Sequence, residues 1–122
     1  MTLELLSGTF SVCTLPDATQ VDWSDPLVFL CKTDQELSLV CPAASVPANT
    51  LEREDGWSAL RVQGPLDFSL VGILARLSEV LAKAGVSIFA VSTYCTDYLL
   101  VRQRQLEQAL ACLRQAGYSI NK

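Results

Sequence analysis

The chain has 122 residues, half of them apolar and 18% charged, with a net charge of −4 at neutral pH. This length and composition exclude a disordered or fibrous protein and indicate one compact unit with its own core, or two small halves that share one. The nine basic residues are dispersed, so the acidic chain offers no surface for nucleic acid.

The apolar runs of the sequence are short. The longest, such as residues 27–31 and 69–74, fall far below the roughly 20 residues that a membrane-spanning helix needs. The first residues, Met-Thr-Leu-Glu-Leu-Leu, carry an acid where a secretory signal carries basic side chains. We therefore expect a cytoplasmic protein without a membrane span.

The five cysteines are odd in number and have neither the spacing of a disulfide framework nor a Cys-x-x-Cys pair. We interpret them as free, reduced thiols of the core that bind no metal. Cys95 is the exception in position, because it falls in a predicted turn; no neighbouring base or positive cluster would activate it, so we interpret it as a turn residue. The five are Cys13, Cys31, Cys41, Cys95 and Cys112.

The first half of the chain reads as short strands. Residues 10–13 alternate apolar and polar side chains, and the apolar runs 27–31 and 37–41 are separated by a polar connection of hairpin length, which predicts an antiparallel pair. Residues 42–47 have room for at most one helical turn. The polar, acidic stretch 49–56 is the best internal boundary, so the second half begins near Trp57.

The second half shows a clearer alternation of elements. A strand ending at residue 62 meets the bend Gly64-Pro65, and apolar residues at three- and four-residue spacings then predict a helix over 69–84, capped by Asp67 or Ser69 and closed by Gly85. Strands at 86–91 and 98–101 follow, then a helix at 106–113 closed by Gly117, and a last strand at 118–120.

These elements predict an α+β, ferredoxin-like βαββαβ fold, with antiparallel sheets and helices on one face. Residues 57–122 form the complete unit, and residues 1–56 repeat its strand order with both helices shrunken or missing, as in a degenerate duplication. The strands at 27–31 and 86–91 are apolar on both faces, so the second face needs cover from the other half, a partner subunit or both. We expect a homodimer.

Catalytic chemistry lacks its usual residues. The chain has no histidine, which removes Ser-His-Asp and Cys-His systems, and it contains neither G-x-x-x-x-G-K-[ST] nor G-x-G-x-x-G. We therefore expect no enzyme activity, no cofactor and no metal.

Two segments could bind a small ligand. The bend and helix start near Gly72 would offer unpaired backbone N–H groups to a carboxylate, with Asp67 facing an ammonium group; alternatively, Asp67 only caps the helix and Gly72 only permits close packing. Asp97, in the turn at 92–97, could bind a cationic side chain or could be an ordinary turn residue.

At these segments the sequence resembles the ACT domain family, regulatory modules of βαββαβ fold that bind amino acids. Asp67 and the run Val71-Gly72-Ile73-Leu74 resemble the family's acid and P-G-x-L signature, with Val71 where proline is usual. The stretch 91–101 is similar to the S-T-F-x-x-D-x-x-L-V segment of the CASTOR arginine sensors and of small bacterial ACT proteins. The resemblance implies that Thr93, Tyr94 and Asp97 line an effector pocket, where the aspartate meets a guanidinium group.

The sequence thus predicts a sensor that binds a free amino acid, arginine first, and acts allosterically on a regulated target protein. The alternative is a protein-interaction module with a vestigial ligand site. The candidate ligand-binding residues are Leu66, Asp67, Phe68, Ser69, Val71, Gly72, Ser92, Thr93, Tyr94 and Asp97.

Overall fold

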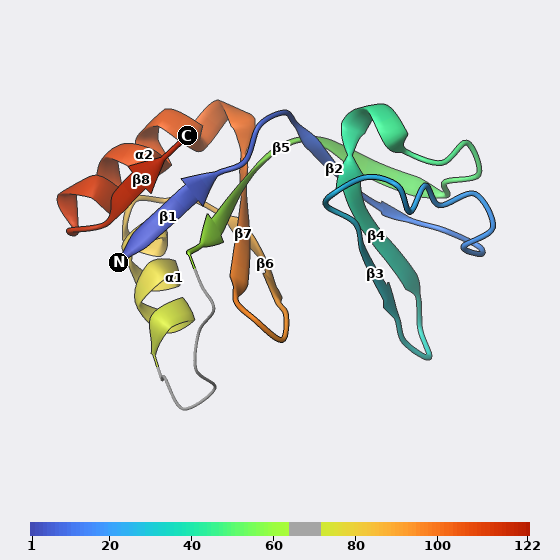
Figure 1. The fold of residues 1–122 in the computed structure, drawn as a ribbon, viewed down its shortest axis with the longest axis horizontal. Coiled ribbons are helices and arrows are strands. Elements are labelled where there is room, and N and C mark those ends of the chain that lie inside the picture. The colour runs from blue at the N-terminus through green and yellow to red at the C-terminus, as the bar shows by residue number, and fades with distance from the viewer. Residues whose placement is uncertain (64–71) are drawn as a thin grey trace. The chain divides into compact units, whose positions relative to one another are not determined.

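A computed structural model describes residues 1–63 and 72–122 of the chain (Figure 1). Its elements form two compact units. Unit 1 comprises Met1–Ser7 and Ser58–Lys122, and unit 2 comprises Gly8–Trp57, so unit 2 is inserted between the first strand and the rest of unit 1.

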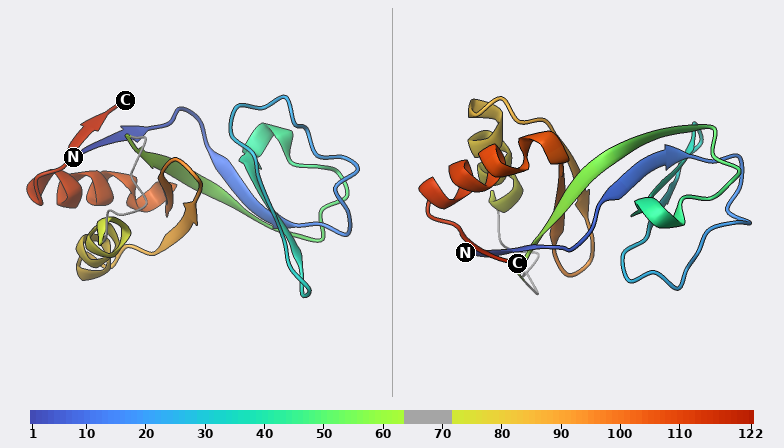
Figure 2. Two further views of the ribbon diagram at one scale, coloured as in Figure 1. Left: turned by 60° about the horizontal axis from the view of Figure 1, so that its bottom comes forward. Right: turned by 90° about the horizontal axis from the view of Figure 1, so that it is seen from above.

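Unit 1 contains a five-stranded sheet of order β8-β1-β5-β7-β6. Its strands are β1 (Thr2–Leu5), the second part of β5 (Glu52–Val62), β6 (Ile88–Ser92), β7 (Asp97–Arg102) and β8 (Ser119–Asn121). β1 pairs antiparallel with β5 and parallel with β8, and β6 pairs antiparallel with β7. Helices α1 (Ile73–Lys83) and α2 (Leu106–Gln115), the latter preceded by the 3₁₀ turn η2 (Gln103–Gln105), lie on one side of this sheet (Figure 2).

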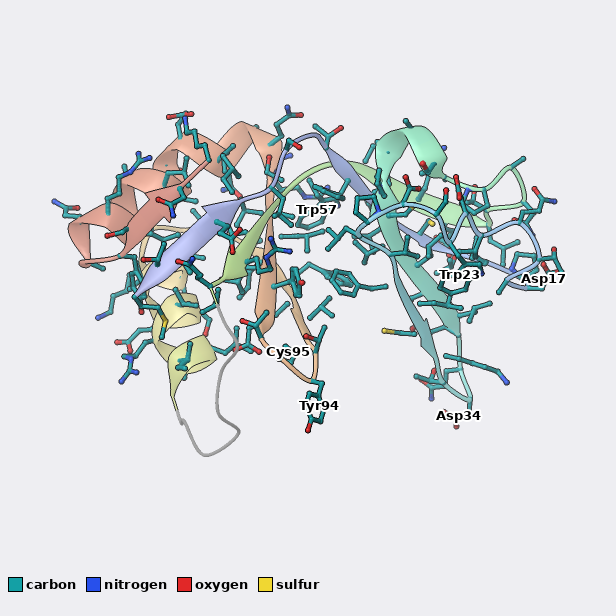
Figure 3. All side chains as sticks on the ribbon, in the orientation of Figure 1. Asp17, Trp23, Asp34, Trp57, Tyr94 and Cys95 are labelled. Carbon is teal, nitrogen blue, oxygen red and sulfur yellow. The ribbon has the colours of Figure 1, made fainter. Side chains whose placement is uncertain are left out.

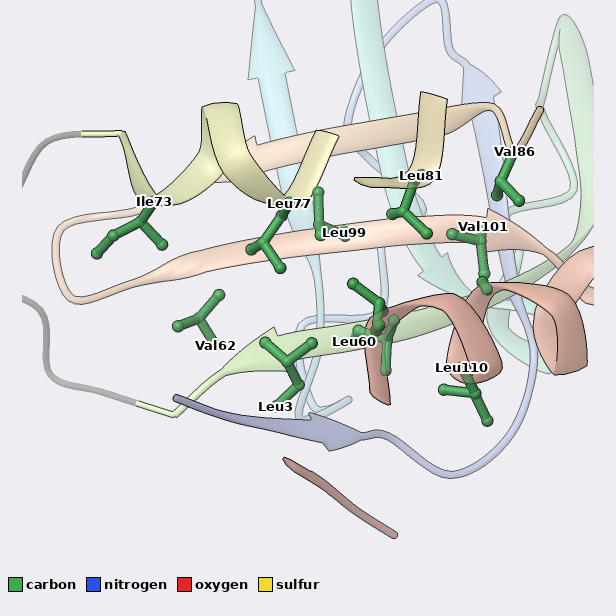
Figure 4. Close-up of a cluster of buried hydrophobic side chains, with 12 residues drawn as sticks. Leu3, Leu60, Val62, Ile73, Leu77, Leu81, Val86, Leu99, Val101 and Leu110 are labelled. Atoms are coloured by element: carbon green, nitrogen blue, oxygen red, sulfur yellow. The ribbon is translucent and has the colours of Figure 1, made fainter. Parts of the chain in front are cut away.

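The core of unit 1 lies between that sheet and the two helices (Figure 4). The central strands β5 and β7 contribute alternate residues to this core, since every second side chain of a strand points to the same face. The buried side chains on this face are aliphatic and come from strands and helices alike: Leu3, Leu60, Val62, Ile73, Leu77, Leu81, Val86, Leu99, Val101, Ala109, Leu110 and Leu113.

Both helices of unit 1 end as the sequence predicts. Gly85 and Gly117 adopt left-handed backbone angles, with φ of 75° and 101°. At the end of α1 the N–H of Val86 donates to the carbonyl of Leu81, and at the end of α2 the N–H of Tyr118 donates to that of Leu113. These bonds satisfy carbonyl groups that would otherwise lack partners at a helix end.

Unit 2 contains a four-stranded antiparallel sheet of order β5-β2-β4-β3. Its strands are β2 (Phe10–Thr14), β3 (Phe29–Lys32), β4 (Leu37–Pro42) and the first part of β5, and one 3₁₀ turn, η1 (Ala43–Ser45), follows β4. A small core packs under the loop between β2 and β3. It consists of Cys13, Leu15, Val21, Leu39 and Cys41.

Some elements of the two units have matching lengths and order. β4 (Leu37–Pro42) and η1 (Ala43–Ser45) recur 60 positions later as β7 (Asp97–Arg102) and η2 (Gln103–Gln105). β4 and β7 even share the same order of half-buried and buried positions along the strand. In unit 2 a loop replaces the helix between the first and second strands of the repeat, and η1 replaces the second helix.

The structure confirms the α+β class with helices on one face of a sheet. The sheet of unit 1 is mixed and not wholly antiparallel as predicted, because β8 runs parallel to β1. Three local predictions also change. Residues 2–5 form β1, a strand that the sequence did not suggest, and the charged residues 52–56 belong to β5. The helix predicted from residue 69 begins at Ile73, because Gly72 before it has a φ of 78° and left-handed backbone cannot continue a right-handed helix. Gly72 stands at the N-cap position, and the predicted caps Asp67 and Ser69 lie outside the described residues.

The thiols also differ from the expectation of a wholly core position. All five are free, but only Cys13 and Cys41 are buried, Cys112 is half-buried, and Cys31 and Cys95 are exposed. Cys31 lies in the exposed half of β3, next to the turn that leads to β4. No helix of the described residues is long and apolar enough to cross a bilayer.

Candidate functional site

The hairpin between β6 and β7 carries four of the predicted site residues. Ser92 and Asp97 are the last cross-strand pair before the turn. The Ser92 hydroxyl donates to the Asp97 carboxylate at 2.7 Å, so the structure brings these two predicted residues together. Asp97 is half-buried, whereas Ser92 is exposed.

Thr93 closes the turn through its backbone and its side chain. Its N–H donates to the carbonyl of Thr96 at 2.9 Å, and its hydroxyl donates to the same carbonyl at 3.0 Å. The N–H of Thr96 in turn donates to the Thr93 hydroxyl at 3.4 Å. The Thr93 side chain is thus used to hold the turn, a common role for threonine in tight connections.

Thr96 ties this hairpin to the strand that precedes the predicted bend. Its side chain is 7% exposed, and its hydroxyl donates to the carbonyl of Val62 at 2.6 Å. Val62 is the last residue of β5. This contact could not be predicted from the sequence, because a threonine in a turn is ordinary and its partner lies 34 positions away.

Tyr94 and Cys95 form the tip of the turn, where Tyr94 points away from the body of unit 1 (Figure 3). Tyr94 is 81% exposed, the largest exposure among the large apolar side chains described. Most of the Tyr94 side chain is thus open to solvent at the tip of the hairpin. The described residues alone therefore do not form the pocket wall to which Tyr94 was predicted to belong.

The start of α1 is the second described part of the predicted site. Among the described residues no side chain caps this helix, and its first turn contains no acid. A Cβ added to Gly72 would lie 4.0 Å from Arg76 Nη1, which is an ordinary contact. The left-handed backbone explains a glycine at this position, and among the described residues a Cβ there would meet no closer atom.

The two parts lie at the same end of unit 1, together with the end of β5 at Val62 (Figure 4). The predicted residues Leu66, Asp67, Phe68, Ser69 and Val71 lie outside the described residues. The described portion of the site is therefore Gly72, the Ser92–Asp97 pair and the threonine-closed turn.

A charged cluster that the sequence did not reveal lies beside the hairpin, on the sheet face opposite the helices. Arg61 of β5 pairs with Glu4 of β1, with Nη2 and Oε2 3.0 Å apart, and its guanidinium carbon lies 5.9 Å from the ring centre of Tyr98. The pKa of the Arg61 guanidinium is raised above its ordinary value. The hydrogen bond to Glu4 is the largest cause, and the hydrogen bond to Tyr98 is the second. The cluster holds β1, β5 and β7 together next to Asp97.

A surface groove of about 350 Å³ lies elsewhere in unit 1, between the carboxyl-terminal halves of α1 and α2. It includes none of the predicted site residues. Its lining is mainly apolar, with Lys83 and Gln115 as the polar members, and comprises Val80, Lys83, Ala84, Cys112, Gln115 and Ala116. Among the described residues, no group of three His, Cys, Asp or Glu side chains is placed to bind a metal ion.

The family profile of the ACT domain matches residues 52–115, more than half of the chain. The chain belongs to the ACT domain family. ACT domains are regulatory modules that bind amino acids, and the match includes β5, α1, the β6–β7 hairpin and α2. Both described parts of the candidate site therefore lie within the matched region.

Solved structures show the same fold over nearly the whole ACT protein. A protein from Agobacterium tumefaciens is 34% identical, with a TM-score of 0.87 over 98% of this chain and 90% of that chain. A protein of unknown function from Vibrio cholerae, described as a possible transport protein, is 24% identical, with a TM-score of 0.72 over 93% of this chain and 88% of that chain.

An allosteric enzyme also contains this fold. The aspartate kinase of Clostridium acetobutylicum matches 90% of this chain with a TM-score of 0.68 at 13% identity, but the match covers only 33% of the kinase. At that identity the likeness concerns the fold alone. The part of the kinase outside the match has no counterpart in the 122 residues of this chain.

Proposed function

We propose that this ACT protein senses a free L-amino acid, with arginine the first candidate, and acts allosterically on a partner protein. The observation that carries the proposal is the Ser92–Asp97 pair, a carboxylate fixed by a 2.7 Å hydrogen bond at the end of unit 1 where α1 begins. A carboxylate has about four acceptor positions. One bond from Ser92 therefore leaves capacity for a guanidinium group.

The proposed site combines this hairpin with the bend before α1. Asp67 would pair with the ligand's ammonium group, and backbone N–H groups of the bend and helix start would bind its carboxylate. Two acids suit a ligand with two positive charges. The full proposed set is Leu66, Asp67, Phe68, Ser69, Val71, Gly72, Ser92, Thr93, Tyr94 and Asp97.

We also propose that unit 2 is a degenerate ACT repeat that has lost this site. Its β3–β4 hairpin has the same threonine-closed turn, in which the N–H of Thr33 donates to the carbonyl of Glu36 at 2.9 Å. However, Lys32 and Leu37 stand at the positions of Ser92 and Asp97. A lysine and a leucine cannot bind a guanidinium group, so we expect one arginine per chain.

Thermal unfolding with each of the twenty amino acids tests the proposal. A ligand that binds only the folded state stabilises it by about 2.7 kcal/mol at a hundredfold excess over Kd. We expect Asp97→Ala to weaken arginine binding about 10- to 100-fold, since a charge-assisted pair contributes about 1.5–3 kcal/mol, and to change the binding of neutral amino acids little. Asp67→Ala should weaken the binding of all of them.

Asp34→Ala is the matched control, because Asp34 is an exposed acid in the corresponding turn of unit 2. It should leave arginine binding unchanged, and calorimetry should give one site per chain. If no amino acid at millimolar concentration shifts the melting temperature, the sensor proposal fails. A protein-interaction module with a vestigial site is then the better account, and a partner isolated at fixed stoichiometry would support it.

A further inference from the structure

The chain passes between the two units twice. One passage lies between Ser7 and Gly8, and the other lies between Trp57 and Ser58 within the length of β5. Two covalent links restrict relative motion more than one does. The range of φ and ψ that the residues at these two passages can adopt therefore limits any rotation of one unit relative to the other.

Each passage has a glycine with left-handed backbone beside it. Gly8 has a φ of 86° and Gly56 a φ of 82°. The other described glycines with positive φ are Gly72, Gly85 and Gly117, and each lies at an end of α1 or α2. Gly8 and Gly56 have no such helix end to explain them.

Space does not explain these two glycines either. A Cβ added to Gly8 or to Gly56 would meet no atom of the described residues within 4 Å. What a side chain would remove is backbone freedom, since glycine occupies both positive and negative φ at little cost. Both passages therefore have the residue type that best tolerates a change of backbone angle.

The strand ladder is also interrupted at the passages. In unit 1 the last pair of β1 with β5 is Leu5 with Leu60, and in unit 2 the first pair of β2 with β5 is Phe10 with Trp57. Residues 6–9 on one segment thus face only residues 58 and 59 on the other. The register shifts again between Phe10 and Val12, opposite Gly56.

Hydrogen bonds beside the interruption stay within their own unit. The N–H of Leu6 donates to the carbonyl of Ala59 at 2.9 Å, inside unit 1. The carbonyl of Thr9 accepts from the N–H of Ala43 at 3.0 Å, inside unit 2. Neither of these two hydrogen bonds crosses from one unit to the other.

We infer that residues 6–9 and 56–58 form a two-stranded hinge on which unit 2 turns relative to unit 1, with Gly8 and Gly56 as its pivots. A hinge consists of a few residues that absorb a change of φ and ψ while the packed bodies on either side stay intact. The inference rests on local backbone geometry and does not depend on the ligand proposed above.

Distances between spin labels test the hinge, because the chain has an exposed thiol in each unit, Cys31 and Cys95. Both are labelled after Cys112→Ser, and mass spectrometry verifies that the buried thiols stay unlabelled. The reference sample labels Cys95 and Ala111→Cys, both in unit 1, in a chain that also carries Cys31→Ser and Cys112→Ser. Dilution into unlabelled protein restricts the measurement to distances within one chain. Pulsed electron paramagnetic resonance should give a broader distance distribution for the inter-unit pair than for the reference pair.

Asparagine substitutions at Gly8 and Gly56 provide a second test of the hinge. It tolerates left-handed backbone but has a smaller conformational range than glycine, so Gly8→Asn with Gly56→Asn should narrow the inter-unit distribution by roughly a third or more. Gly85→Asn is the matched control, since Gly85 has a φ of 75° and equally open space for a Cβ. It should leave the inter-unit distribution unchanged.

Two results would overturn the hinge. One is an inter-unit distribution in the unmodified backbone as narrow as that of the reference pair, a comparison that needs no pivot variant. The other is a pivot variant, folded by circular dichroism, whose distribution matches that of the Gly85→Asn control.

Discussion

Cys13 and Cys41 are the two thiols that the structure buries, and both belong to the small core of unit 2. Burial raises the pKa of Cys13, and it raises the pKa of Cys41 to about 11 from an ordinary value of 9.0. In both cases desolvation of the thiolate is the largest cause. The folded protein therefore keeps these thiols protonated at a pH where the unfolded chain has begun to lose the protons.

This difference predicts a loss of stability at alkaline pH. Below about pH 9 the Cys41 thiol is protonated in both the folded and the unfolded state, so its contribution to the free energy of unfolding is fully present. Between about pH 9 and 11 the unfolded chain loses this proton while the folded protein still keeps it. The contribution of Cys41 to stability is lost over this range. Urea unfolding from pH 7 to 11 measures the slope. Cys41→Ala should lower stability at every pH but flatten the alkaline decline, and an unchanged decline would show that another group causes it.

The candidate site shows how far single residues can be interpreted from sequence. Ser92 and Asp97 were predicted as members of one turn, and they do share a hydrogen bond, because residues that flank a short hairpin turn must face each other. Thr96 was not predicted, since its contact with Val62 depends on the packing of two strands distant in sequence. Tyr94 illustrates the opposite case, because the resemblance implied a pocket wall and the described residues leave it exposed.

Among the elements, those with strong periodicity were predicted well and those without it were not. β4, β7 and α2 follow their apolar patterns closely, and the cap at Gly85 follows from its place after the last periodic residue of α1. The charged start of β5 has no apolar alternation, because this part of the strand keeps its side chains exposed. The start of α1 was misplaced because the apolar period continues through Leu70, while the backbone angle at Gly72 is not visible in a pattern of side chains.

β1 was missed for a related reason and provides a test at this scale. It has four residues, of which only Leu3 is fully buried, so no periodicity can develop. Leu3 nevertheless packs in the main core of unit 1, and Leu3→Ala should lower the free energy of unfolding by about 2–5 kcal/mol.

The control for this change is Leu51→Ala, because Leu51 is 66% exposed and its truncation should alter stability by no more than about 0.5 kcal/mol. Chemical denaturation of the two variants beside the unmodified chain gives the comparison. A loss for Leu3→Ala no larger than that for Leu51→Ala would mean that β1 is not an integral strand of unit 1.

For the whole molecule, we propose a homodimer. Both helices of unit 1 cover the same face of its sheet, and the other face carries Phe89 of β6, which is only half-buried. Apolar side chains on a second sheet face need cover. Light scattering at micromolar concentration should give twice the 13.3 kDa mass of one chain, and a mass of one chain would contradict the dimer.

The position of β1 has a consequence for the order in which the protein is made. Thr2, Leu3 and Glu4 are synthesised long before Ser119, Ile120 and Asn121, the residues with which they pair. The strands of unit 2 all lie between these two segments, so their pairing can be complete while β1 still lacks β8. Domains formed from nearby segments close during synthesis, and pairings of high sequence separation come late. Unit 2 should therefore fold on the nascent chain before unit 1 does. Until unit 1 has folded, the apolar side chain of Leu3 is exposed and accessible to chaperones.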